Sequence, residues 1–195
     1  MDRPRLILAS RNAHKIVELE RIAPWVEWLP LPVELGDPPE TGLTFETNAV
    51  QKATYVFEQT GLFALADDSG LAVEALAGRP GVHSKRYSAE GSDVANNRLL
   101  LAQLDGLVPR TARYHCVIAV CGPGVSLTHG ATCEGTVGLA PRGNGGFGYD
   151  PLFWPDERPG RTMAELSPVE KDSISHRGRA MLGLANLLSR AGILG

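Results

Sequence analysis

The chain has 195 residues, of which 43% are hydrophobic, so it can bury a core as one domain or as one domain with a lobe. Its 19 Lys and Arg and 22 Asp and Glu give a formal charge of −3, which excludes the broad basic surface that nucleic acid polymers require. No apolar run approaches the roughly 18 residues of a membrane helix, and the N-terminus does not resemble a signal peptide. We therefore expect a cytoplasmic protein that binds neither membranes nor nucleic acid polymers.

The N-terminal half alternates between predicted strands and helices. Residues 5–9 are short and aliphatic, which predicts a buried strand, and apolar residues at helical spacing then predict a helix that ends at Pro24. Residues 29–42 contain four prolines and predict an acidic loop. Thr44 is placed to cap a long helix that ends at Gly61, and residues 62–66 predict a second buried strand.

The C-terminal half predicts a hairpin followed by helices. Residues 77–92 are irregular, and Asp93 is placed to cap a helix. Residues 113–120 and 125–136 are rich in β-branched residues and flank a Gly-Pro-Gly turn, which predicts antiparallel strands. A last helix is expected to start near Ser175 or His176. Together these elements predict a single α/β domain over residues 1–195, with a mixed twisted sheet and flanking helices.

The segment Ala66-Asp67-Asp68-Ser69-Gly70 carries the strongest local signal for chemistry. The two adjacent acids follow a predicted strand, where α/β proteins commonly place their active sites. Carboxylates of this kind suit Mg²⁺, which takes one or two of them and completes its shell with water and substrate phosphates. An Asx turn that caps a helix would use the same residue types, so this alternative stays open.

Three further segments supply chemistry that complements a metal site, and each also has an ordinary structural explanation. Residues 10–15 join a strand to a helix and offer amides, a hydroxyl group and a lysine to phosphate, or they form a helix cap. Residues 145–150 hold two aromatic rings among glycines, which suits stacking on a base or a turn with core rings. Residues 170–179 are a charged helix start, with His176 and Arg177 as donors or as solvated side chains.

With these motifs in order along the chain, the sequence resembles the inosine triphosphate pyrophosphatase family over nearly its whole length. The matching motifs are Leu8-Ala9-Ser10-Arg11-Asn12 with Lys15, residues 40–46 with Asn48-Ala49, residues 66–71, Phe147-Gly148-Tyr149-Asp150-Pro151, and Glu170-Lys171 with residues 175–178. The resemblance implies two lobes around a central nucleotide cleft, a homodimer, and Mg²⁺-dependent hydrolysis of ITP, dITP and XTP to monophosphate and pyrophosphate. The chain departs from the family's usual Thr-Gly-Asn loop at Ser10-Arg11-Asn12.

The resemblance also implies roles for individual residues. Asp68 is the expected catalytic residue, holding or deprotonating the attacking water, and Asp68, Glu40 and Asp67 are the expected metal ligands, with Glu34 as the alternative to Glu40. We expect Arg177 and His176 to donate to the purine 6-carbonyl group, and Phe147, with Tyr149 or Trp154 as weaker candidates, to stack on the base. The expected substrate-binding residues are Ser10, Arg11, Asn12, Lys15, Lys52, Ser69, Phe147, Gly148, Tyr149, Asp150, Lys171, His176 and Arg177.

Two rival functions fit part of the pattern. A Maf-like hydrolase of pyrimidine or modified nucleotides also opens with a strand and a polar loop, but it usually carries Ser-Pro-Arg-Arg where this chain has Ser-Arg-Asn-Ala. A nucleotide sensor without catalytic activity would need no acid-rich metal site, so the Asp67-Asp68 pair argues against it.

Overall fold

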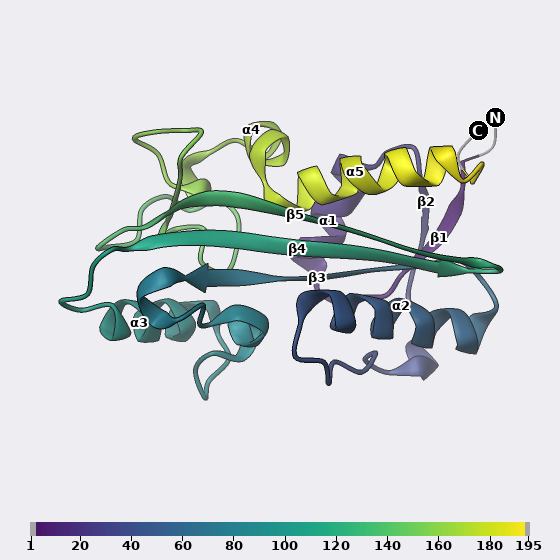
Figure 1. Ribbon diagram of the computed structural model, residues 1–195, viewed down its shortest axis with the longest axis horizontal. Helices are drawn as coiled ribbons and strands as arrows, with labels where there is room; N and C mark the ends of the chain where they lie inside the picture. Colours follow the sequence, from purple (N-terminus) through teal and green to yellow (C-terminus); the bar gives the residue numbers. More distant parts are fainter. Residues whose placement is uncertain (1–2, 194–195) are drawn as a thin grey trace. The chain divides into compact units, whose positions relative to one another are not determined.

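A six-stranded mixed sheet runs through the computed structural model, which describes residues 3–193 (Figure 1). The strand order is β2-β1-β3-β4-β5-β6. The strands are β1 (Arg5–Leu8), β2 (Glu27–Leu29), β3 (Ala64–Val73), β4 (Thr111–Gly122), β5 (Val125–Val137) and β6 (Phe153–Pro155). Strand β1 pairs in parallel with β2 and with β3, whereas β5 and β6 are antiparallel. The predicted mixed sheet with flanking helices is therefore confirmed.

Within residues 3–193, five α-helices accompany the sheet. They are α1 (Ala13–Ile22), α2 (Phe45–Thr60), α3 (Asp93–Gln103), α4 (Pro168–Ile174) and α5 (His176–Arg190). Short 3₁₀ helices lie at Val33–Leu35, Glu74–Leu76, Gly81–Arg86 and Met163–Glu165. Among the helices of residues 3–193, none has the length and apolar character needed to cross a bilayer.

The chain divides into two compact units, which share the long strands β3, β4 and β5. The first unit takes in the chain up to Asp68, Cys116–Ala131 and the chain from Arg177 onward. The second takes in Ser69–His115 and Thr132–His176. Among residues 3–193, the buried apolar clusters of each unit are made of residues of that unit.

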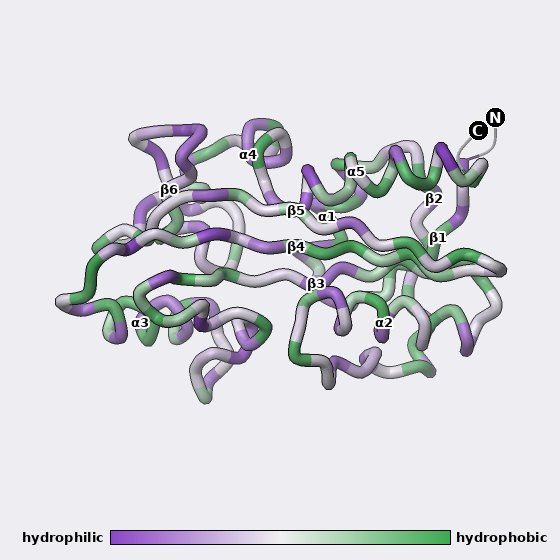
Figure 2. Tube along the Cα trace, viewed as in Figure 1, coloured by the Kyte–Doolittle hydropathy of each residue, from purple (hydrophilic) through white to green (hydrophobic). Residues whose placement is uncertain are grey.

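In the first unit, helices cover both faces of the sheet (Figure 1). Helix α2 packs Ala49, Ala53 and Val56 against one face, together with small and aliphatic residues of β1 and β3. Helices α1 and α5 pack against the other face, and α5 buries Ala180, Met181, Leu184 and Leu188 there. Figure 2 shows the matching alternation of hydrophobic and hydrophilic residues along α5. This pattern is that of a helix with one apolar stripe toward the core.

Local signals set the ends of α2, which carries several residues of the candidate site. The Thr44 side chain accepts a hydrogen bond from the amide of Thr47, which satisfies one of the free donors at the helix start. Gly61 ends the helix with φ of 70°, in the left-handed region that favours glycine. The predicted cap and stop of this helix are both confirmed.

In the second unit, one apolar cluster packs α3 against residues of β3, β4, β5 and β6. Leu100 and Leu104 of α3 pack with Leu71 and Val73 of β3 and with Phe153 of β6. Cys133 lies in this cluster, while Cys116 and Cys121 lie in the cores of the first unit. All three cysteines are buried and free.

Candidate functional site

Asp67 and Asp68 lie inside β3 and not at its end. The sequence predicted a strand over residues 62–66 followed by the acids, and this boundary was wrong because β3 continues to Val73. The Asx turn considered as the alternative is also absent at these residues. Carboxylates are tolerated within a buried strand when each has charged or polar partners, and here both have them.

Asp67 is held by two cations. Its Oδ2 accepts hydrogen bonds from Arg177 Nη2 at 2.9 Å and Nε at 3.2 Å, and Lys15 Nζ lies 3.1 Å from the same oxygen. Burial alone would raise the pKa of Asp67, but Lys15, Arg177 and Lys52 hold it below its ordinary value. Asp67 is therefore ionised at neutral pH. Because its side chain is fully buried and paired with these cations, the geometry does not favour the predicted role as a metal ligand.

Arg177 is equally buried and extends this network to α1. Its side chain is 1% exposed, and Nη1 donates to Glu18 Oε2 at 2.5 Å. Burial would lower its pKa, but the charges of Asp67 and Glu18 contribute to raising it. The guanidinium thus donates to two carboxylates. To donate to a purine carbonyl group as predicted, it would have to exchange one of them for the base.

Asp68 has different partners from its neighbour. Asn48 Nδ2 donates to Asp68 Oδ2 at 3.0 Å, and Lys52 Nζ lies 3.4 Å from Oδ1. Lys52 also donates to Glu40 Oε1 at 2.6 Å and to the carbonyl oxygen of Asp67 at 2.7 Å. Burial raises the pKa of Asp68, against the opposing effects of Lys52, Lys15 and Asn48. A carboxylate that accepts a proton more readily than usual is suited to act as a general base.

The loop before α1 holds itself together with the residues predicted to bind phosphate. Ser10 Oγ accepts from the amide of Asn12, and the Asn12 side chain caps α1 by accepting from the amides of His14 and Lys15. This is the helix cap considered from the sequence. Lys15 then lies in the first turn of α1 with its ammonium group at Asp67. The start of α1 thus carries Ser10, Asn12 and Lys15, and the free backbone amides at a helix start favour the binding of anions.

Arg11 is engaged with the proline-rich loop that follows β2. Its Nη2 donates to three backbone carbonyl groups of that loop, those of Pro32, Val33 and Gly36, at 2.9 to 3.3 Å. Its Nε lies 3.4 Å from Asp37 Oδ1. These contacts give Arg11 a role in anchoring the loop. They provide no contact that supports the predicted role in substrate binding.

In the second unit, Asp150 organises the glycine-rich aromatic segment. It accepts hydrogen bonds from Tyr114 Oη at 3.1 Å, from the amide of Phe147 at 2.9 Å and from Lys171 Nζ at 2.5 Å. Lys171 Nζ also lies 4.9 Å from the centre of the Phe147 ring, within the range of a cation–π contact. The structure thus brings together three predicted substrate residues, namely Phe147, Asp150 and Lys171.

Helix α3 holds the backbone of the same segment. The amide of Gly148 donates to Asp93 Oδ2 at 2.7 Å, and its carbonyl oxygen accepts from Asn97 Nδ2 at 2.9 Å. Gly148 has φ of 63°, which explains the preference for glycine there. The position of the neighbouring Phe147 is therefore set from both sides of the segment.

Two predicted aromatic or donor residues lie in the core of the second unit. Tyr149 is buried and donates through Oη to the carbonyl oxygen of Ser84, and burial raises its pKa. This placement does not favour Tyr149 as a platform for a base. His176 is also buried, and its ring stacks on Tyr114 with the centroids 4.6 Å apart and the planes at 8°. Ser69 lies in β3 and is partly buried.

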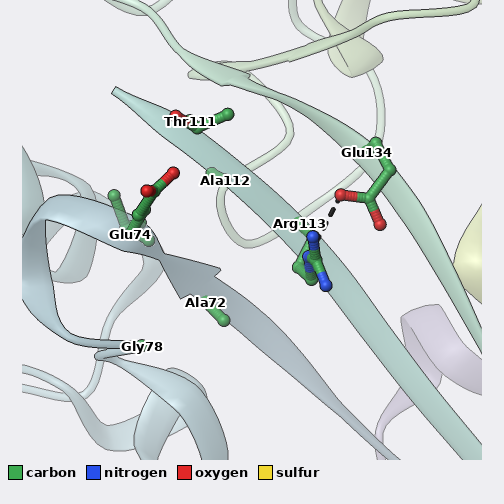
Figure 3. A pocket seen from close by; sticks show the side chains of 8 residues that line it. Ala72, Glu74, Gly78, Thr111, Ala112, Arg113 and Glu134 are labelled. Atoms are coloured by element: carbon green, nitrogen blue, oxygen red, sulfur yellow. Dashed lines mark ion pairs between the residues drawn. The ribbon is translucent and has the colours of Figure 1, made fainter. Parts of the chain in front are cut away.

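The structure also shows what the candidate residues do not form. Within residues 3–193, no three His, Cys, Asp or Glu side chains group closely enough to hold a metal by themselves. A hollow of about 260 Å³ in the second unit is lined by Glu74, Thr111 and the Arg113–Glu134 ion pair, among others (Figure 3). Its lining includes none of the predicted site residues.

Several residues of the site were given no role from the sequence. Glu18 and Asn48 are buried polar residues on helices, and Tyr114 lies on β4. Asn48 precedes Lys52 by four positions, which places both on one face of α2, so helical spacing carried a usable signal. Glu18 and Tyr114 gave no comparable signal, because their partners Arg177 and Asp150 lie 159 and 36 residues away.

Comparison with known proteins gives a consistent result. A model described as the Ham1 family matches residues 6–187. The dITP/XTP pyrophosphatase of Geobacter sulfurreducens is 48% identical over 97% of this chain and 98% of its own, and that of Frankia alni is 50% identical over 94% and 96%. The Staphylococcus aureus Ham1 protein superposes with a TM-score of 0.87 at 36% identity, covering 96% of this chain and 99% of its own. A HAM1 protein from Coxiella burnetii superposes with a TM-score of 0.85 at 39% identity, again covering 96% of this chain and 99% of its own.

Proposed function

The chain belongs to the Ham1 family, and from this membership and the surroundings of Asp68 we propose that it hydrolyses deaminated purine nucleoside triphosphates. The substrates are dITP, ITP and XTP, and the products are the nucleoside monophosphate and pyrophosphate. The names of the relatives support this substrate class. The removal of such nucleotides cleanses the nucleotide pool.

One observation in the structure carries the proposal. The buried Asp68 carboxylate has two polar partners, Asn48 and Lys52, while Lys15 lies at the adjacent Asp67. A base beside two lysines suits the attack of water on a phosphoanhydride, since the lysines offset the charge of the phosphate oxygens.

We also propose that the reaction uses a divalent cation, and the residues present fit one. The carboxylates of Glu40 and Asp68 already converge on a single cation, the ammonium group of Lys52, at 2.6 and 3.4 Å. We propose Mg²⁺ as the metal, which these two carboxylates would hold. When bound, it supplies Lewis-acid polarisation of the phosphate oxygens. Asp67, paired with Arg177 and Lys15, serves as a support for the site.

Residues of the chain are proposed to accept the proton of the attacking water and to offset the negative charge of the phosphate oxygens. Asp68 accepts a proton from the attacking water, whose oxygen bonds to the α-phosphorus as the bond from that phosphorus to the bridging oxygen breaks. The electron pair of that bond leaves with pyrophosphate. Lys15 and Lys52 hold the phosphate oxygens and offset the charge of the leaving group. Ser10, Asn12, Ser69 and Lys171 are proposed as further partners of the substrate's oxygens.

Selection of the base is proposed to depend on the aromatic segment and on the start of α5. Phe147 stacks on the purine, and Gly148 and Asp150 keep that ring in place. Donors at His176 and Arg177 match the 6-carbonyl group of hypoxanthine and xanthine, whereas adenine presents an amino group there. An unpaired buried polar group costs roughly 1–3 kcal/mol, so ATP is expected to be a poor substrate.

Arg177→Ala tests whether Arg177 recognises the purine base or only supports the Asp67 carboxylate. If the guanidinium exchanges a carboxylate for the base, the variant should lose much of the wild-type preference for ITP over ATP, measured as the ratio of kcat/KM values. The loss of support for Asp67 should lower both activities by a common factor, so the ratio isolates base recognition. An unchanged ratio would leave Arg177 as a partner of Asp67 and Glu18 alone.

We also propose that the protein forms a homodimer in the cytoplasm, as the resemblance of its sequence implies. Light scattering on the purified protein tests whether it is a dimer. A mass of one chain, about 20.9 kDa, would contradict it.

The substrate proposal is tested by measuring pyrophosphate release from dITP, XTP, GTP, ATP and a pyrimidine triphosphate, each with and without Mg²⁺. We expect Mg²⁺-dependent release that is fastest with dITP and XTP. Preferential hydrolysis of pyrimidine nucleotides would indicate the Maf-like activity. Nucleotide binding without any product would indicate a sensor.

A further inference from the structure

Three consecutive contacts join α2 to the loop that carries Glu40. Lys52 binds the Glu40 carboxylate, Gln51 bonds to both the amide and the hydroxyl group of Thr41, and Asn48 Oδ1 accepts from the amide of Gly42 at 2.7 Å. The three helix residues span little more than one turn, so they present their side chains to one stretch of loop. Of these three, Asn48 and Lys52 also reach Asp68.

Asn48 uses both ends of its side-chain amide. Its oxygen accepts from Gly42 and its nitrogen donates to Asp68 Oδ2, and the residue is 2% exposed. Only one orientation of the amide satisfies both partners, because an amide N–H and a carboxylate need opposite ends of the group. A Cβ at Gly42 would lie 2.8 Å from Asn48 Oδ1, so glycine is what allows this close approach.

From this geometry we propose that Asn48 is a positioning residue that fixes the orientation of the Asp68 carboxylate and ties it to the loop of Glu40. This inference rests on the proposed function. A neutral donor suits the task, because it restrains the carboxylate without adding a further cation to compete for its charge. Asp67 provides the contrast, since its restraint comes from a guanidinium and an ammonium group.

Two substitutions separate the bonds that Asn48 makes. Asn48→Ala removes both, whereas Asn48→Asp keeps an acceptor for Gly42 and replaces the donor to Asp68 with a second acceptor. For each variant we expect kcat for dITP to fall roughly 10- to 100-fold, since misplacing a reacting group by about 1 Å has an effect of this size. The affinity for a non-hydrolysable dITP analogue, measured by calorimetry, should change less than about threefold, because Asn48 is expected to act on the reacting carboxylate and not on binding.

Gln51→Ala is the matched control. It removes an anchor of the same loop from the same helix but has no bond to Asp68, so its kcat should stay within about threefold of wild type. Thermal unfolding of all variants shows which ones are folded. If Asn48→Ala does not fold, Asn48→Asp, which keeps the loop bond, still provides the test.

A double-substitution cycle with Asp68→Asn tests whether Asn48 acts through Asp68. In the Asp68→Asn background, Asn48→Ala should lower the residual kcat less than about threefold. Two results would overturn the inference: a folded Asn48→Asp variant with wild-type kcat, or an Asn48→Ala effect of equal size with and without Asp68. A wild-type protein that releases no pyrophosphate would instead refute the proposed function itself.

Discussion

Asp67 and Asp68 are neighbours in β3 but have different surroundings. Asp67 lies against Lys15 and Arg177, which lower its pKa, whereas burial raises that of Asp68. Two adjacent carboxylates whose environments shift their pKa values in opposite directions can take different roles. Asp67 is suited to remain a permanent anion that orders its cations, and Asp68 is suited to exchange a proton.

Asp67→Asn should destabilise the protein in a pH-dependent way. The substitution leaves Arg177 and Lys15 without that negative charge in a buried site, which typically costs about 3–5 kcal/mol at neutral pH. In the wild type, the folded pKa of Asp67 lies below the ordinary value of 3.8, so its stabilising effect is complete above that value and is lost as the pH falls through the folded pKa. In urea unfolding, the difference in the free energy of unfolding between the two proteins should therefore narrow below about pH 4.

The control for this prediction is Asp105→Asn, at an exposed position. It should change the free energy of unfolding by less than about 0.5 kcal/mol, both at neutral pH and below about pH 4. The difference in the free energy of unfolding between wild type and Asp67→Asn could instead stay constant or widen as the pH falls. That result would contradict a lowered pKa of Asp67.

At the scale of elements, the helices and the hairpin could be predicted because their signals are local. Pro24 follows α1 closely, Thr44 and Gly61 bound α2, and Pro123 with Gly124 joins β4 to β5. Strand β2 was missed because its three residues are too few to show a period. The charged segment 170–179 was predicted as one helix start, but Ser175 adopts ψ of 151° and separates α4 from α5.

The partners within the candidate site could be predicted only in part. The residue types were identified from the motifs, but their pairing depends on tertiary packing. Arg177 meets Asp67 across 110 residues of sequence, and no local pattern signals that the guanidinium is buried with two carboxylates. For the same reason, the extension of β3 through two acids was unexpected, since only these distant partners make it favourable.

The pairing of β5 with β6 requires glycine at position 135. Gly135 lies opposite Pro155, and a Cβ there would overlap the backbone carbonyl oxygen of Trp154. Gly135→Ala should therefore destabilise the protein by about 1–3 kcal/mol in urea unfolding. Gly130→Ala on the same strand is the control, because its Cβ would make an ordinary contact with Val117 at 3.4 Å. Equal stabilities of the two variants would show that the β6 contact relaxes at no cost.

At the scale of the whole molecule, a chain with a net charge of −3 places several of its cations beside buried carboxylates. In the first unit, Lys15, Lys52 and Arg177 come from three different helices and meet the two acids of β3. In the second unit, Lys171 meets Asp150 and the Phe147 ring. These local groups of cations, and not a broad basic surface, are the candidates for binding phosphate.

The role of Asp68 as the general base is tested by measuring pyrophosphate release from dITP by the wild type and by Asp68→Asn, together with the affinity of each protein for the nucleotide. Removal of a general base typically lowers turnover by about 10²- to 10⁴-fold, and we expect a loss in this range with nucleotide binding retained. Near-normal turnover by Asp68→Asn would show that Asp68 is not the general base.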